Sequence, residues 1–555
     1  MNLTRRRAAA AEIVLLFALA AAAWVLYGSV ARLWWTHDDL YHLHLILGNP
    51  RFWYFWDRAV YQAPPPKMLT PLLFLSLDVD RWLFGLRPAA FHLHQIGSLC
   101  LAPPALYAVL RLWLGRTWSA VGAFLFLLGP PVASIALMIM VRHYVEVIPV
   151  AALAVGLWVL ALRRPDRDRR GALLAVASAL VWFLAALEKE TAVPLVLFLL
   201  LIPERTLRER LWRWAPHGVL LCVYTVTRVF FLGSPKGYGF EVRPGDWPRL
   251  ILTLPVKIAA EMRGLPTVAS WTLLAAVLLG LVVVACRGRQ EALRVGAALA
   301  LTLAPVLPVA TLMEPRYAVA AWVVAAMAFP FACRGLAEKS GRRWPAAILA
   351  LLACVAGLVA NRQDWAVRFT DSVRRSREAQ AFLALGPGDL LRRPLGVPGE
   401  LGELRWWKED VERLPGGSSW FFDDLYLCLH APAAPGRIWG WDEGSRRVVD
   451  LTPRLAAIRR VACDTSHDQA PLRVEIRGEG TGIAWELGPY RDGSYRFLLG
   501  DGALAVEMPR TGGFLLRQLA PLTLRVKYES PEGWFTYSPP LTVDPARRTV
   551  VRWRR

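Results

Sequence analysis

Residues 34–44 read Trp-Trp-Thr-His-Asp-Asp-Leu-Tyr-His-Leu-His, and they directly follow the first long apolar run of the chain, residues 8–30. An ionised carboxylate in hydrocarbon costs about 2.5–3.5 kcal/mol on the most lenient scale, so it faces water, a partner or a cavity. Paired tryptophans favour the headgroup level. The pattern therefore predicts that Asp38 and Asp39 lie at a membrane surface. Because neighbouring helical residues do not share a face, we expect the two carboxylates to have different roles.

The composition is that of a polytopic helical membrane protein. Of the 555 residues, 55% are hydrophobic, and the mean hydropathy is +0.34. The net charge of +21 comes from arginines in short clusters between apolar runs. This is the pattern of positively charged cytoplasmic loops, so the charge indicates topology and argues against a nucleic-acid partner.

Eleven segments are apolar enough to be predicted as membrane spans, which need about 20 residues each. They are residues 8–30, 89–113, 118–138, 145–162, 171–187, 192–203, 216–232, 267–285, 291–311, 317–333 and 344–360.

Six basic clusters fall on one side of the membrane if the N-terminus is cytoplasmic. That topology places the acid pair in a long first external loop, residues 31–88, and everything after Asn361 outside. Residues 1–24 resemble a signal peptide without a cleavage signal, which indicates an uncleaved anchor. The clusters lie at residues 5–7, 111–116, 163–170, 205–213, 287–294 and 334–343.

The first external loop contains an aromatic run and an interrupted apolar segment. Residues 51–57 suit interfacial anchoring, with a stacking platform for a sugar or lipid ring as the alternative. Residues 68–85 are interrupted by Asp78, Asp80 and Arg81, so they suit a helix lying in the interface.

Charged residues also occur at three later external junctions. Residues 171–203 hold two predicted passes in 33 residues, so the turn Glu188-Lys189-Glu190-Thr191 must lie below the outer surface. It either lines a wet, protein-walled cavity or pairs with itself. Arg142 and Arg316 occupy two further junctions. Arginine and lysine bind phosphate, so these cations suit an anionic ligand. Residues 233–266 form either a closing loop or a connector.

After Asn361 the composition predicts a second domain. Residues 371–385 predict a linking helix, and short alternating runs from about residue 401 predict a mainly β domain, a probable sandwich. Cys428 and Cys463 are able to pair in an oxidising compartment. The predicted strands are residues 472–476, 482–487, 495–499, 515–519, 522–528 and 549–553.

An external carboxylate pair with cations, in a chain whose sequence has no nucleotide-binding glycine loop, suggests transfer from a lipid-phosphate donor. The acceptor hydroxyl needs a general base, and the leaving phosphate needs fixed positive charge. These residues resemble the polytopic GT-C glycosyltransferases, in particular the protein O-mannosyltransferase-like family with transmembrane spans and tetratricopeptide repeats. The matching stretches, all within residues 1–361, are Thr36–Asp39, Lys67–Leu93, Glu188–Glu190 and Glu314–Tyr317.

The chain departs from that family in three respects. Its residues 362–555 predict a β domain in place of the repeats, Pro66-Lys67 stands where the family has Arg-Pro, and Glu188 stands where the family has serine. Since soluble domains often choose the acceptor, the resemblance leaves the acceptor open among protein, lipid and glycan.

The resemblance implies roles for the external residues. Asp38 would be the general base, with Asp39 the second candidate. Glu190 would orient Lys189 or the donor sugar. The donor would be bound by Arg142, His143, Lys189, Arg316 and Tyr317.

A metal requirement is left open by the acidic stretch. Imidazole suits transition metals, and carboxylate suits magnesium or manganese. The candidate ligands of a divalent ion are His37, Asp38, Asp39 and His42.

The resemblance predicts an O-glycosylating enzyme of the bacterial inner membrane, with its N-terminus cytoplasmic and its C-terminal domain periplasmic. Its partners would be the bilayer, a polyprenyl-phosphate-linked sugar and the acceptor. The non-enzyme alternative is a transporter or flippase of a lipid-linked or anionic solute, which inverted repeats would favour. A second enzyme alternative is a ligase or polymerase of cell-envelope glycans.

Overall fold

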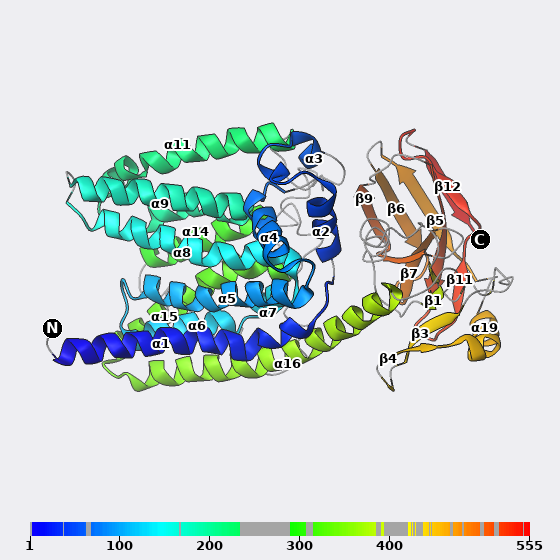
Figure 1. Cartoon of the computed structure of the whole chain (residues 1–555), viewed down its shortest axis with the longest axis horizontal. Helices are drawn as coiled ribbons and strands as arrows, with labels where there is room; N and C mark the ends of the chain where they lie inside the picture. The colour runs from blue at the N-terminus through cyan, green and yellow to red at the C-terminus, as the bar shows by residue number, and fades with distance from the viewer. Residues whose placement is uncertain are drawn as a thin grey trace. The chain divides into compact units, whose positions relative to one another are not determined.

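A computed structural model gives the fold as two compact units (Figure 1). One holds most of residues 1–372, and the other holds residues 373–555 together with residues 36–49 and 63–65. Each unit is described by itself. The structure describes residues 3–36, 38–62, 68–165, 168–233, 289–306, 315–383, 390–392, 420–422, 425, 428 and 437–555, the last range with gaps at 443, 446, 465, 467–469, 480–481, 500–503, 516–520 and 548.

The first unit is a bundle of apolar helices, and among the described residues seven are long enough to cross a membrane. Together they confirm that the chain is a polytopic helical membrane protein. The seven are built on α1 (Leu3–Tyr27), α5 (Pro88–Leu110), α8 (Arg142–Leu162), α9 (Arg169–Glu188), α11 (Leu207–Leu232), α15 (Val319–Ser340) and α16 (Trp344–Leu383).

A bent helix pair is an eighth candidate crossing or a re-entrant loop. Helices α6 (Arg116–Leu127) and α7 (Pro130–Leu137) meet at 56° and together cover the predicted span 118–138. A side chain on Gly129 would collide with the indole of Trp322, which donates a hydrogen bond to the Phe126 carbonyl at 2.9 Å. Glycine at the bend and proline at the start of α7 therefore allow the close approach that breaks the helix.

The expectation of eleven regular spans is too high for the described part of the chain. Residues 190–201 form only short turns, η4 (Glu190–Ala192), α10 (Leu195–Phe198) and η5 (Leu199–Leu201), and α14 (Arg289–Leu303) is also shorter than a span. Apolar composition alone cannot separate a full crossing from such a short buried segment. The predicted span 267–285 and most of the loop 233–266 lie outside the described residues.

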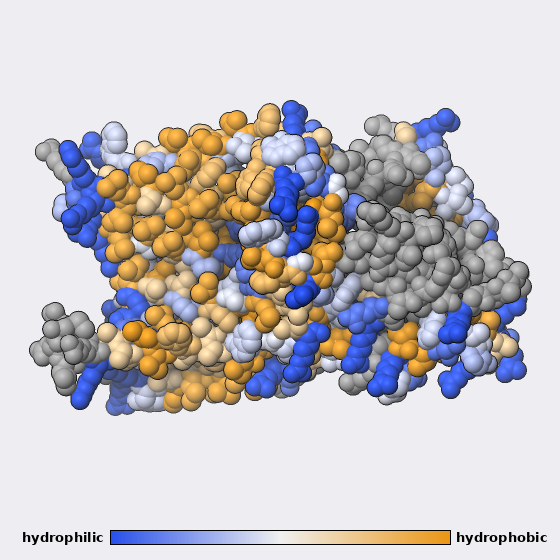
Figure 2. Space-filling view, in the orientation of Figure 1, coloured by the Kyte–Doolittle hydropathy of each residue, from blue (hydrophilic) through white to orange (hydrophobic). Residues whose placement is uncertain are grey.

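The surface of the helical unit has the pattern of a protein in lipid. Figure 2 shows hydrophobic residues over most of the visible side of the helices, with hydrophilic residues towards the helix ends. Large apolar side chains such as Phe17, Leu173 and Val226 are more than two-thirds exposed. Exposure of this kind along whole helices is stable only against hydrocarbon.

Several predicted basic clusters lie at one end of the bundle, as the sequence predicted. Arginines of different loops donate hydrogen bonds to carbonyls of neighbouring loops, which ties these loops together. These bonds run from Arg163 to Leu112 O (2.8 Å), from Arg213 to Arg164 O (2.9 Å) and from Arg334 to Trp113 O (2.9 Å).

The apolar segment of the first loop is helical, as expected. It forms α4 (Pro71–Phe84), preceded by η1 (Gly28–Arg32), α2 (Asp39–Gly48), η2 (Trp53–Phe55) and α3 (Arg58–Gln62). On α4, Asp78 and Asp80 are buried, whereas Trp82 and Leu83 are exposed. The helix therefore turns its carboxylates towards the protein and part of its apolar surface outwards.

The second unit contains the expected β sandwich. One sheet has the order β11-β10-β7-β8, with β12 on β10, and the other has the order β13-β5-β6-β9. Val474 and Leu487 of one sheet share a core with Phe497 and Val526 of the other. The strands are β5 (Arg473–Gly478), β6 (Gly482–Gly488), β7 (Ser494–Leu499), β8 (Leu504–Met508), β9 (Thr511–Leu515), β10 (Leu522–Glu529), β11 (Phe535–Tyr537), β12 (Leu541–Val543) and β13 (Val550–Arg554).

One strand of the second unit, β9 at Thr511–Leu515, was not predicted as such. The strand predicted at residues 515–519 lies, apart from Leu515, outside the described residues. Within the sheet, a side chain on Gly512 would collide with the Trp485 indole, so glycine is required in the strand itself.

A smaller sheet was not predicted from the sequence. Its order is β2-β1-β3-β4, and β1 pairs in parallel with both β2 and β3. The predicted disulfide between Cys428 and Cys463 is confirmed. The predicted linking helix is also confirmed, as the end of the 40-residue α16. The elements are β1 (Leu390–Arg392), β2 (Trp420–Phe422), β3 (Ile438–Asp442), β4 (Arg447–Asp450), η9 (Thr452–Arg454) and α19 (Leu455–Asp464).

Candidate functional site

The acid pair divides into one exposed and one buried carboxylate. Asp38 is exposed at the start of α2, where its side chain makes no capping bond. Asp39 is buried, and its Oδ2 accepts a hydrogen bond from the Thr36 backbone N–H at 3.0 Å. The expectation of different roles thus has a structural counterpart, because Asp39 braces the loop and Asp38 faces outwards. This stretch belongs to the second unit, so it is described apart from the cations of the first.

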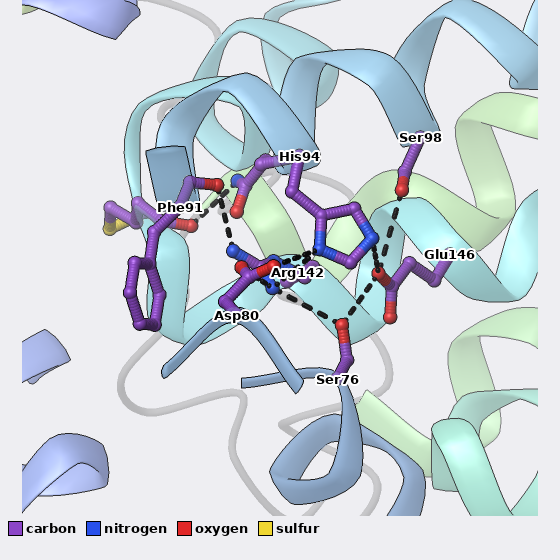
Figure 3. A network of polar contacts seen from close by, with 9 residues as sticks. Ser76, Asp80, Phe91, His94, Ser98, Arg142 and Glu146 are labelled. Atoms are coloured by element: carbon purple, nitrogen blue, oxygen red, sulfur yellow. Dashed lines mark hydrogen bonds and ion pairs between the residues drawn. The ribbon is translucent and has the colours of Figure 1, made fainter. Parts of the chain in front are cut away.

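Arg142 is the centre of a buried polar network (Figure 3). Its guanidinium is fully buried and forms a 2.6 Å ion pair with Asp80 of α4. It also donates to the Phe91 carbonyl at 2.7 Å and to the Ser76 hydroxyl at 3.2 Å. Arg142, which the sequence predicted to bind phosphate, is therefore already paired with a carboxylate of the protein. Its neighbour His143 is buried as well, with its ring 4.8 Å from that of Tyr144.

A second carboxylate group adjoins this network. His94 contacts Asp80 through Nδ1 at 2.7 Å and Glu146 through Nε2 at 3.5 Å. Glu146 also accepts a 2.9 Å hydrogen bond from Ser76, and it lies against the buried carboxyl of Glu188. Two touching carboxylates in a buried site cannot both be charged without a balancing cation or proton.

Lys189 directly follows Glu188 in the chain, and its surroundings differ from those of Arg142. It is 2% exposed, and its Nζ contacts the Met68 sulfur at 3.2 Å and lies 4.4 Å from the Tyr144 ring centroid. None of the ion pairs within the described residues includes it. Burial lowers the pKa of Lys189 to about 8, and nearby Arg316 and Arg228 also lower it against the opposing effect of Glu190. The described groups in direct contact with its ammonium are therefore a sulfur atom and an aromatic ring, both soft and polarisable.

Glu190 forms its described bonds with groups other than Lys189. Its Oε1 forms an ion pair with Arg228 of α11 and accepts a hydrogen bond from the Leu69 backbone N–H at 3.1 Å. Its expected role toward Lys189 or a donor sugar stays a prediction. Sequence reasoning missed Arg228, although an arginine inside an apolar span is itself a signal of a functional or paired site.

Arg316 and Tyr317 complete the set of predicted donor-binding residues in this unit. Both are half-buried in η8 (Pro315–Ala318), where the Arg316 guanidinium lies 5.3 Å from the Tyr317 ring centroid. Arg316 also contacts the Met138 sulfur at 3.7 Å. Because Arg316 and Arg228 both act electrostatically on Lys189, the three cations form one positively charged region.

An apolar cavity of about 140 Å³ opens beside the Lys189 region. Tyr144, whose ring faces the Lys189 ammonium, lines it together with Thr191. Apart from a few hydroxyls its walls are apolar side chains of α5, α8, α10, α14 and α15. They include Leu106, Ile148, Leu195, Leu301, Val323 and Met327.

A metal at the acidic stretch stays a prediction. His42 Nδ1 is 2.9 Å from the Asp38 backbone oxygen, and Asp39 is engaged with the Thr36 N–H. Within the described residues, no three His, Cys, Asp or Glu side chains come together as ligands. His37 lies outside the described residues.

The chain was compared with known proteins, and no family model and no curated protein matches its sequence. It is similar to the oligosaccharyltransferase of Archaeoglobus fulgidus, solved with zinc and sulfate, at 13% identity and a TM-score of 0.46 over 89% of this chain and 72% of that one. It is also similar to ArnT of Cupriavidus metallidurans bound to undecaprenyl phosphate, at 17% identity and a TM-score of 0.47 over 79% and 97%. A third similar structure is the archaeal oligosaccharyltransferase AglB with an inhibitory peptide and a dolichol-phosphate, at 11% identity and a TM-score of 0.42 over 90% and 74%. Since every TM-score is below 0.5, no conclusion about this chain rests on these similarities.

Proposed function

We propose that the protein is a membrane glycosyltransferase that moves a sugar from a polyprenyl-phosphate-linked donor to an acceptor hydroxyl. The observation that carries the proposal is Lys189, a buried cation that none of the described ion pairs includes, placed beside an apolar cavity. A buried ammonium is stable when an anion or strong acceptor meets it. A lipid phosphate supplies both missing parts, an anion for Lys189 and an isoprenoid chain for the cavity.

The proposed donor site uses Lys189 and Arg316 for the phosphate. Charge-assisted hydrogen bonds from such groups stabilise the negative charge that grows on the leaving phosphate. Arg142, which the sequence predicted as a phosphate ligand, instead holds Asp80 in this proposal, because its guanidinium is already bonded there. For the orientation of the protein in the membrane we keep the sequence prediction, in which the N-terminus is cytoplasmic and the sugar is transferred on the outer face.

In the proposed reaction the acceptor oxygen attacks the anomeric carbon of the sugar. The bond from that carbon to the phosphate oxygen breaks, and polyprenyl phosphate leaves with the bonding electrons. Asp38 takes the acceptor proton as general base, since it is the exposed member of the acid pair. Asp39 shapes the loop through its bond to the Thr36 N–H.

The deciding experiment measures transfer of labelled sugar from a polyprenyl-phosphate donor in membranes that contain the protein, beside binding of farnesyl phosphate. Asp38→Asn should lower turnover by about 10²–10⁴-fold, the usual contribution of a general base, and leave binding intact. Full turnover in both Asp38→Asn and Asp39→Asn would remove the acid pair from the mechanism. Binding without any transfer by the unmodified protein would favour the transporter or flippase alternative.

A further inference from the structure

We infer that Arg228 is a positioning residue whose task is to keep Glu190 from neutralising Lys189. The inference rests on the proposed function and concerns how its phosphate site stays positively charged. Glu188 and Glu190 flank Lys189 in the chain, so they are the two acidic groups nearest to it by sequence. In the structure the Glu188 carboxyl lies against Glu146, and the Glu190 carboxylate is bonded to Arg228 of α11.

Two bonds fix the Glu190 side chain. The guanidinium of Arg228 holds Oε1 from α11, and the Leu69 backbone N–H donates to the same atom at 3.1 Å. The second bond also fixes the chain at Met68, whose sulfur contacts the Lys189 ammonium at 3.2 Å. The Glu190 carboxylate therefore fixes the backbone beside Met68, which contacts Lys189. Its own side chain is held in place by Arg228.

The free-energy cost of this arrangement indicates its function. A buried ammonium and a carboxylate one residue away would be expected to pair, since pairing offsets desolvation of both. The chain instead places an additional arginine in an apolar helix, where charges are expensive. Within the described residues this arrangement leaves Lys189 outside every ion pair, which suits a site that must accept an external anion.

The summed charge of the residues around Lys189 provides a test of the inference. Lys189, Arg228, Arg316 and Glu190 sum to +2, as three cations and one anion, and Glu188, which also acts on Lys189, is the same in every variant. Arg228→Met lowers the sum to +1 and releases Glu190 toward Lys189. Adding Glu190→Gln returns the sum to +2 through Lys189 and Arg316 alone, and the glutamine oxygen still accepts from the Leu69 N–H.

The experiment is titration of farnesyl phosphate into purified full-length protein in detergent. Arg228→Met should weaken binding by about tenfold or more, the lower end for a charge-assisted bond. The double variant Arg228→Met/Glu190→Gln should return to within about threefold of the unmodified protein, because coupled residues are non-additive. Arg213→Met is the matched control, since it removes another arginine of α11 that bonds to carbonyls at Ala161 and Arg164.

The outcomes separate the inference from the proposed function. If the double variant binds as weakly as Arg228→Met, Arg228 contacts the phosphate itself and the positioning role is wrong. If Glu190→Gln alone weakens binding as much as Arg228→Met, Glu190 is a ligand and the inference is again wrong. Failure of the unmodified protein to bind farnesyl phosphate would instead overturn the proposed function, and thermal unfolding of each variant reports any loss of fold.

Discussion

Arg142 and Lys189 are both fully or almost fully buried, yet their surroundings differ. Arg142 has a carboxylate at 2.6 Å and two further hydrogen bonds, whereas Lys189 has a sulfur atom and an aromatic ring. The two side chains therefore carry the same charge and are buried to a similar extent, and they differ in the groups that contact them. The contrast shows that a buried cation becomes a candidate for ligand binding when the fold withholds its counter-ion.

Removing Arg142 should have the largest effect. Arg142→Met leaves the buried Asp80 carboxylate with His94 as its remaining described partner, and breaking a buried pair typically destabilises a protein by about 3–5 kcal/mol. Unfolding in detergent measures the loss. Adding Asp80→Asn should recover part of it, because the uncompensated charge is then gone. A loss below about 1 kcal/mol in Arg142→Met would mean that the network of Figure 3 is not structural.

Removing Lys189 should act on binding and leave stability almost unchanged. Lys189→Met removes a buried charge that none of the described ion pairs includes, so unfolding should be unaffected or slightly less favourable. Binding of farnesyl phosphate should weaken by about 10–100-fold, the value of one charge-assisted hydrogen bond. A variant that unfolds as readily as Arg142→Met and binds normally would reverse the comparison between the two cations.

The sequence located these two cations but could not separate them. Apolar runs and basic clusters identified the spans and placed Arg142, Lys189 and Arg316 at external junctions, because hydrophobic length and loop charge are local properties. The partner of each cation is not local. Asp80 is brought to Arg142 across 62 positions by the packing of α4 against α8, and no sequence pattern encodes that choice.

Arg228 and the small parallel sheet were missed for different reasons. Arg228 lies inside a predicted span, where its charge was available as a signal, although its partner Glu190 was not. The parallel pairing of β1 with β2 and β3 joins segments far apart in the chain, and two of these strands have only three residues. Strands that short fall below what alternation can identify.

The pH dependence of binding should sharpen the contrast with a smaller effect. Burial lowers the pKa of Lys189 to about 8, so the free site loses its cation as the pH rises through that value. Affinity for farnesyl phosphate, already a dianion above pH 7, should fall by up to about tenfold per pH unit beyond it. Lys189→Arg keeps its charge in this range, so its affinity should stay level between about pH 7 and 9. Equal slopes for both proteins would assign the dependence to another group.

The smallest expected effect concerns Glu188, which precedes Lys189 and lies against Glu146. Two touching carboxylates, one of them buried, are both charged only if a cation balances them, so Glu188→Gln tests whether a cation or a proton balances this pair. Glu188→Gln supplies a neutral donor of nearly the same shape, so the change in unfolding free energy should stay below about 1 kcal/mol if a proton balances the pair. Glu188→Ala is the matched control, because it removes the hydrogen-bonding group as well and leaves Glu146 with less support. A loss in Glu188→Gln as large as that of Arg142→Met would mean that both carboxylates are ionised around a bound cation, and the network beside Lys189 would then be a second charged site in place of a structural one.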